Sequence, residues 1–112
     1  MWARSEAFWV GVDRSDRVAR LRLSGRFDAG AILHLDDTFA DIGDRNVVLD
    51  LSGLTYMDGA AWLALMSYEH RVREAGRDFG LENAFGAIRR IFEATETEYL
   101  LSESGRLMGG PR

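Results

Sequence analysis

The sequence contains no cysteine and no lysine. Its basic residues are 14 arginines and two histidines. Without cysteine there is no disulfide, no thiolate nucleophile and no cysteine-ligated zinc. Without lysine, Schiff-base chemistry and a lysine-containing phosphate loop are excluded. The sequence also has no run of about 20 apolar residues, so it predicts no direct insertion into a membrane.

The chain is short and mildly acidic. Its 112 residues fit one domain, and a hydrophobic content of 46% is ordinary for a folded protein. The formal net charge of -4 and the absence of a basic stripe argue against a nucleic-acid partner. The first 13 residues lack the long apolar core of a signal peptide. We therefore expect a cytoplasmic protein.

The first third of the chain predicts a hairpin followed by a helix. Two β-prone runs, residues 8–12 and 18–23, flank a polar turn, and the second run alternates polar with apolar residues. Residues 29–42 follow, with Asp28 placed to cap a helix. The predicted inward face of this helix consists of Ile32, Leu35, Phe39 and Ile42.

The middle and last thirds predict alternating strands and helices. Residues 46–51 are almost all apolar β-formers, which suits a central strand covered on both faces. A helix from Ala61, stopped by Gly76, follows, then a short strand at 78–83. The inward face of that helix is predicted to be Leu65, Tyr68, Val72 and Ala75. The next helix is predicted at 85–94, with Phe85, Ile88, Ile91 and Phe92 inward.

The final segment, "EYLL" at 98–101, is predicted as a last strand, and residues 102–112 as a flexible tail. The order of elements predicts a single α/β domain over residues 1–101. Its sheet should be mixed and mostly parallel, with four to five strands packed against about three to four helices.

Side chains that could carry catalysis or hold a metal are scattered. His34 and His70 lie in different predicted helices with no ligand spacing. Four acidic residues lack the spacing of a cation-binding loop and indicate a solvated surface. They are Asp36, Asp37, Asp41 and Asp44. The sequence thus predicts no metal and no cofactor.

Two aspartates could lie close together. Asp28 and Asp58 each follow a strand and precede a helix, so a paired-carboxylate site is conceivable. No serine lies in a Gly-x-Ser-x-Gly turn, and no glycine-rich phosphate loop is present. Nothing signals a pocket around the pair, and we predict that the protein is not an enzyme.

The stretch "YMDGAAW", residues 56–62, is the most informative turn. Asp58 is placed to cap a helix that follows a strand, an arrangement in which proteins often bind anions. Yet the next three residues are Gly59, Ala60 and Ala61, none of which has a reactive group. Trp62 and Met66 share a helical stripe with charged residues, and either anchor a partner or pack beneath a neighbouring loop.

Residues 20–30 ("RLRLSGRFDAG") and 47–95 (from "VVLDLSGLTYMDGAAW" to "IRRIFEAT") together resemble a STAS domain. The resemblance is strongest over residues 17–101 and is to single-domain bacterial anti-sigma factor antagonists. It implies a protein without catalysis that binds an anti-sigma factor of the serine-kinase type. In that family the kinase phosphorylates a serine directly after the turn aspartate, and the complex then dissociates.

The family's turn reads Asp-Ser-Ser-Gly or Asp-Thr-Ser-Gly, and this chain departs from it. Asp58 matches the aspartate, but Gly59 holds the phospho-acceptor position, so the acceptor is lost. Glu96 also stands where the family often has glycine. The resemblance implies a partner-binding surface made of Asp28, Thr55, Asp58, Gly59, Ala60, Ala61, Trp62 and Met66.

Three interpretations remain open at this point. The protein is an antagonist that cannot be switched at the usual position, or a STAS scaffold or subunit of a stressosome-like or lipid or anion transport complex. In the third, phosphorylation has moved to Ser52, Thr55 or Ser67. The β-prone run at 8–12 could also pair with a second copy as an edge strand, which would give a homodimer.

Overall fold

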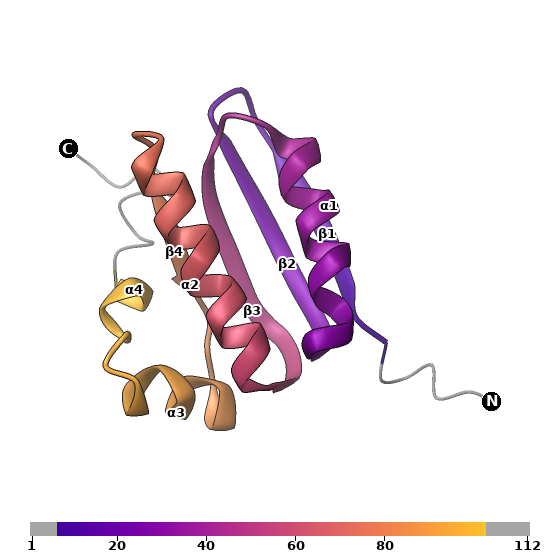
Figure 1. The fold of residues 1–112 in the computed structure, drawn as a ribbon, viewed down its shortest axis with the longest axis vertical. Coiled ribbons are helices and arrows are strands. Elements are labelled where there is room, and N and C mark those ends of the chain that lie inside the picture. The colour runs from indigo at the N-terminus through magenta and orange to yellow at the C-terminus, as the bar shows by residue number, and fades with distance from the viewer. Residues whose placement is uncertain (1–6, 103–112) are drawn as a thin grey trace.

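The computed structural model describes residues 7–102, which form four strands, four α-helices and one 3₁₀ turn (Figure 1). The elements in chain order are β1 (Trp9–Arg14), β2 (Val18–Phe27), η2 (Ala29–Ala31), α1 (Ile32–Ile42), β3 (Asn46–Met57), α2 (Gly59–Glu74), β4 (Phe79–Glu82), α3 (Gly86–Ala94) and α4 (Tyr99–Ser102). The predicted mixed α/β fold is confirmed.

The described sheet has the strand order β1-β2-β3-β4. β1 and β2 form the predicted antiparallel hairpin, whereas β2–β3 and β3–β4 pair in parallel. Each parallel pair needs a crossover, and α1 and α2 provide the two crossovers. Both helices lie over the same face of the sheet, while α3 and α4 lie beside β3 and β4 (Figure 1).

Side-chain alternation along β2 separates the two faces of the sheet. Leu21 and Leu23 are fully buried beneath the helices, whereas Arg20 and Arg22 point to the opposite face. Residues 47–51 of β3 are buried throughout, as expected for a central strand covered on both faces. The core therefore lies between β2, β3, β4 and the inward faces of α1 and α2, and it extends to Ile88, Phe92 and Leu100 of α3 and α4.

A register shift between β2 and β3 requires a glycine. The pairing steps from Arg22 with Asp50 to Ser24 with Gly53, which is an irregularity in the parallel ladder. A Cβ at Gly53 would lie 2.3 Å from the hydroxyl oxygen of Ser24 and 2.9 Å from the carbonyl oxygen of Leu23. Only glycine lets the strands approach this closely, and β3 then continues to Met57, directly before Asp58.

Three details of the predicted elements are wrong. "EYLL" does not form a strand: Tyr99–Ser102 is the short helix α4, which buries Leu100. Phe85 and Ala75 were predicted to face inward, but Phe85 precedes α3 and is 64% exposed, and Ala75 is exposed at the end of α2.

The predicted end of α2 at Gly76 is confirmed by the positive φ of 82° at that glycine. Most of the predicted tail, residues 103–112, lies outside the described residues.

Candidate partner-binding site

Asp58 joins two helical elements at one end of the sheet. Its Oδ1 accepts a hydrogen bond from the backbone N–H of Ala61 (2.9 Å), which caps α2 as predicted. Its Oδ2 accepts from the backbone N–H of Ala29 (3.4 Å), at the start of η2. One carboxylate therefore fixes the start of α2 relative to the segment that follows β2.

Asp28 lies next to this junction, as predicted from its place after a strand. Its Oδ1 accepts from the N–H of Gly30 (3.0 Å), and its Oδ2 pairs with Nε of Arg26 (3.2 Å). The Arg26 guanidinium also lies 3.8 Å from the centre of the Tyr56 ring. The two aspartates thus serve as helix caps, and each already has backbone partners.

The three residues after Asp58 differ in exposure. Gly59 and Ala60 are exposed, whereas the side chain of Ala61 is fully buried in the core. A Cβ at Gly59 would meet nothing within 4 Å. The first turn of α2 therefore offers an open surface at Gly59 and Ala60, and Ala61 takes part only through its N–H.

Trp62 and Met66 are only partly exposed, and both pack against the core. The indole Nε1 of Trp62 is buried without a hydrogen-bond partner among the described residues. The apolar side chain that α2 presents most openly is instead Leu63, which is 61% exposed. The inward periodicity used on the sequence could not detect Leu63, because it lies on the other side of the helix.

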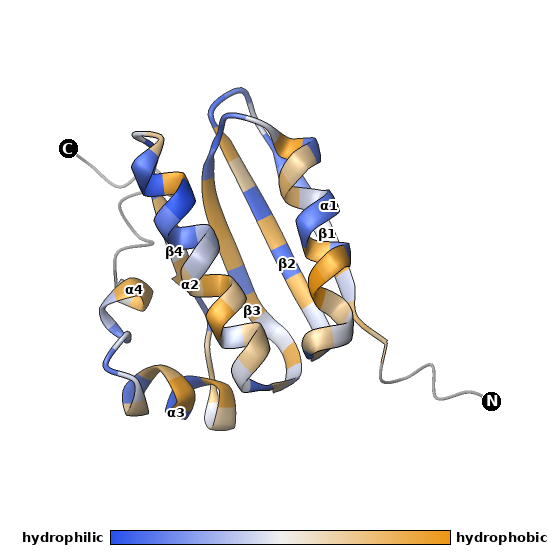
Figure 2. Ribbon diagram, in the orientation of Figure 1, coloured by the Kyte–Doolittle hydropathy of each residue, from blue (hydrophilic) through white to orange (hydrophobic). Residues whose placement is uncertain are grey.

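The exposed residues at this end form what we call the α2 N-terminal surface: Thr55, Tyr56, Gly59, Ala60 and Leu63, with Asp58 at its centre. Figure 1 shows that β2 and β3 end, and α1 and α2 begin, at this same end of the sheet. Figure 2 shows that the N-terminal half of α2 is apolar and its C-terminal half strongly polar. The surface thus combines open backbone with isolated apolar side chains.

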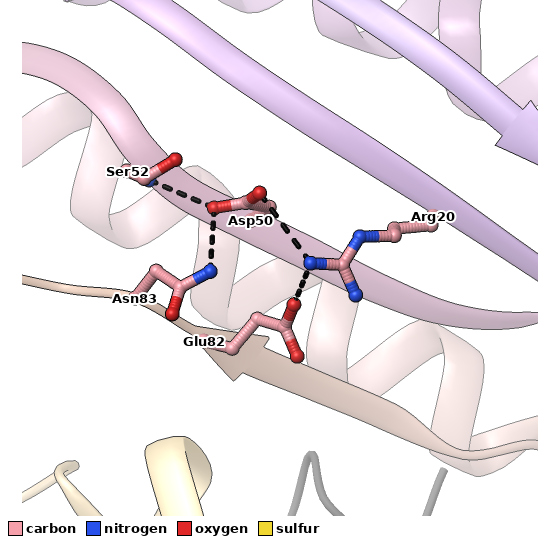
Figure 3. A network of polar contacts seen from close by, with 5 residues as sticks. All are labelled: Arg20, Asp50, Ser52, Glu82 and Asn83. Carbon is pink, nitrogen blue, oxygen red and sulfur yellow. Dashed lines mark hydrogen bonds and ion pairs between the residues drawn. The ribbon is translucent and has the colours of Figure 1, made fainter. Parts of the chain in front are cut away.

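A second polar cluster lies on the sheet face opposite α1 and α2 (Figure 3). Asp50, only 7% exposed, accepts hydrogen bonds from the backbone N–H of Ser52 (3.0 Å) and Nδ2 of Asn83 (3.1 Å). Arg20 lies 3.4 Å from Asp50 and also pairs with Glu82. Burial alone raises the pKa of Asp50, but these hydrogen bonds and the Arg20 charge outweigh it and lower the pKa below 3.8.

The family model described as "Mlab, STAS domain" matches residues 10–102 of the chain. The chain belongs to the STAS domain family. A sequence search of curated proteins found no match.

Several solved structures share this fold at low sequence identity. The unphosphorylated anti-sigma factor antagonist SpoIIAA is 15% identical, with a TM-score of 0.76. The superposition covers 95% of this chain and 100% of the SpoIIAA chain. An antagonist from Mycobacterium paratuberculosis is 17% identical, with a TM-score of 0.76 and coverages of 89% and 87%. A sulfate transporter family protein from Wolinella succinogenes is 16% identical, with a TM-score of 0.65 and coverages of 78% and 73%.

The two histidines of this STAS domain belong to different helices, α1 and α2. His34 is exposed with its ring 5.6 Å from that of Phe8, and His70 is exposed 3.8 Å from Glu74. Within residues 7–102, no three His, Cys, Asp or Glu side chains form a metal-binding cluster. In the same range, no helix is long and apolar enough to cross a membrane.

Proposed function

We propose that this STAS domain is a non-catalytic regulator that binds a protein partner through the α2 N-terminal surface. The observation that carries the proposal is Gly59, the exposed first residue of α2, placed directly after the capping Asp58. This is the position of the phospho-acceptor in the antagonists that the sequence resembles. Glycine has no hydroxyl, so the surface cannot be phosphorylated there.

The proposed partner is an anti-sigma factor of the serine-kinase type. Two solved structures with the same fold are described as anti-sigma factor antagonists, which supports this choice. A phosphate at the start of α2 would add a charge of about -1.5 to -2 to a fitted surface and disrupt it. Without an acceptor at residue 59, phosphorylation at that position cannot change the charge of the surface, so we expect constitutive binding. Such a regulator would act in the cytoplasm.

The second candidate function is that of a scaffold or subunit in a stressosome-like complex or a lipid or anion transport complex. The fold shared with a sulfate transporter family protein favours it. In such a complex the α2 N-terminal surface would be a docking surface that needs no phosphate. β1 is an edge strand of the described sheet, and homodimer formation by strand pairing stays a prediction.

Phosphorylation at another hydroxyl is the third interpretation. Ser52, Thr55 and Ser67 are all exposed, and Thr55 lies three residues before Asp58 on the same surface. Tryptic mass spectrometry of protein isolated from its host would locate such a phosphate. A stoichiometric phosphate on Thr55 would replace the proposal of constitutive binding with that of a relocated switch.

The proposal is tested by restoring the missing hydroxyl. Gly59→Ser should make the protein a substrate for a cognate anti-sigma factor kinase, because a side chain at residue 59 meets open space. The wild type and Gly59→Ala, which adds the same Cβ without the hydroxyl, should bind that kinase and stay unphosphorylated. If Gly59→Ser binds the kinase but takes up no phosphate from ATP, the lost-switch proposal fails. If the wild type binds no such kinase, the proposed function itself fails.

A further inference from the structure

A pocket of about 360 Å³ lies between α1 and α2, at the end of the sheet where β3 begins. α2 contributes Tyr68, Arg71 and Val72, all in its C-terminal half. α1 contributes Asp36, Phe39, Ala40 and Ile42. The pocket is therefore at the opposite end of β3 from Asp58 and shares no residue with the α2 N-terminal surface. Neither the family resemblance nor the proposed function uses it.

One part of the pocket wall is aromatic and apolar, and the rest is polar. The rings of Phe39 and Tyr68 lie against each other across the two helices, with centroids 4.1 Å apart, and Val47 and Val72 also line this part of the pocket. The hydroxyl of Tyr68 donates a hydrogen bond to Asp36. Burial, that hydrogen bond and the charge of Asp36 raise the pKa of Tyr68, so its phenol stays neutral at physiological pH. The Asp36 carboxylate therefore already accepts a hydrogen bond within the protein.

Three arginines, Arg45, Arg71 and Arg77, also line the pocket. Arg45 donates to the backbone carbonyl oxygens of Ser15 (2.7 Å) and Ile42 (2.5 Å). Among the described residues, no carboxylate forms an ion pair with Arg45 or Arg71. The one carboxylate of the described residues that lines the pocket, that of Asp36, accepts a hydrogen bond from Tyr68.

Arg77 and Arg71 both line the pocket, and they differ in burial. The Nε of Arg77 is buried and has no hydrogen-bond partner among the described residues, and its Nη1 lies 3.5 Å from the well-exposed carboxylate of Asp44. A buried guanidinium N–H without a partner costs free energy unless a ligand or water accepts its hydrogen bond. The Arg71 guanidinium is exposed and lies 5.0 Å from the centre of the Tyr68 ring, on the same side as the pocket.

We propose that this pocket binds a small organic anion with an apolar ring or chain. Its carboxylate, sulfonate or phosphate group would lie between Arg71 and Arg77, where planar guanidinium groups suit oxyanions. Its apolar body would pack against Phe39 and Val72. The inference is independent of the proposed partner, because the two sites have no residue in common.

A matched pair of fluorescent probes tests the charge requirement. 1-Anilinonaphthalene-8-sulfonate carries a sulfonate on an aromatic body, and N-phenyl-1-naphthylamine has nearly the same body without the charge. The sulfonate should bind with one site per chain and about tenfold more tightly than the neutral compound. In ¹H–¹⁵N spectra of the folded protein, the sulfonate should shift amides around Phe39, Tyr68, Arg71 and Arg77.

The variants separate this pocket from general surface binding. Arg71→Met, at an exposed helix position, should weaken sulfonate binding by about tenfold and leave the melting temperature nearly unchanged. Arg90→Met removes the same charge from exposed α3 and should leave binding unchanged. The proposal is overturned if both variants bind the sulfonate like the wild type, if both lose affinity equally, if the neutral compound binds as tightly, or if the shifted amides lie elsewhere.

Discussion

At the scale of single residues, two glycines have opposite roles. Close packing requires glycine at residue 53, because any Cβ there would clash with Ser24 and the backbone of Leu23. Gly59 is surrounded by open space, so no steric reason requires glycine at that position. The family resemblance drew attention to Gly59 alone, whereas the requirement for glycine at residue 53 is seen only in the packing of β2 against β3.

Gly53→Ala should therefore destabilise the protein by about 1–3 kcal/mol, because β2 and β3 must separate to admit the methyl group. Gly59→Ala should change the free energy of unfolding much less, and a small stabilisation is expected from reduced freedom of the unfolded chain. Urea unfolding of both variants measures the difference. Equal stability of Gly53→Ala and the wild type would show that the strand pairing around residue 53 tolerates a side chain.

At the scale of elements, β3 and α2 were predictable because several local signals agree. A continuous apolar run marks β3, the capping Asp58 marks the start of α2, and Gly76 marks its end. α4 was predicted wrongly because four residues cannot show a periodicity, and "EYLL" contains β-formers. Leu63 was missed since the period-based prediction selects the buried face of a helix, whereas a binding surface uses the exposed one.

Asp58→Ala removes a cap from α2 and the bond to Ala29, so it should destabilise the protein by about 1–2 kcal/mol. Asp37→Ala, on the exposed side of α1, is the matched control and should stay within about 0.5 kcal/mol of the wild type. Thermal and urea unfolding report both values. The junction between α2 and η2 contributes no stability if the two variants unfold alike.

At the scale of the whole molecule, the topology follows from the order of elements, but the polar cluster on the sheet does not. Arg20, Asp50 and Glu82 come from three different strands, and their meeting depends on the register of both parallel pairings. The sequence showed only that Arg20 belongs to a polar face. Register is a property of the assembled sheet, so this cluster and the pocket between α1 and α2 could not be predicted from local patterns.

Because the pKa of Asp50 is lowered in the folded protein, the free energy of unfolding should decrease as the pH falls into the acidic range. Its pKa is below 3.8 in the folded protein, so its contribution is complete above that value and is lost as the pH falls through the folded pKa. Asp50→Asn should destabilise the protein by about 1–3 kcal/mol at pH 7. The variant should lose less further stability than the wild type between pH 5 and pH 2, as measured by urea midpoints. Parallel pH profiles would contradict this role.

We propose above that the α2 N-terminal surface binds a serine-kinase-type anti-sigma factor. The most direct measurement is affinity purification of tagged wild type, Leu63→Asp and Val12→Asp from the native host, with quantitative mass spectrometry. Leu63 and Val12 are both exposed apolar residues, but Val12 lies on the edge strand β1. The proposal predicts that the kinase co-purifies with the wild type and Val12→Asp and is lost with Leu63→Asp. Recovery of transport subunits instead, or equal recovery of the kinase with all three proteins, would contradict it.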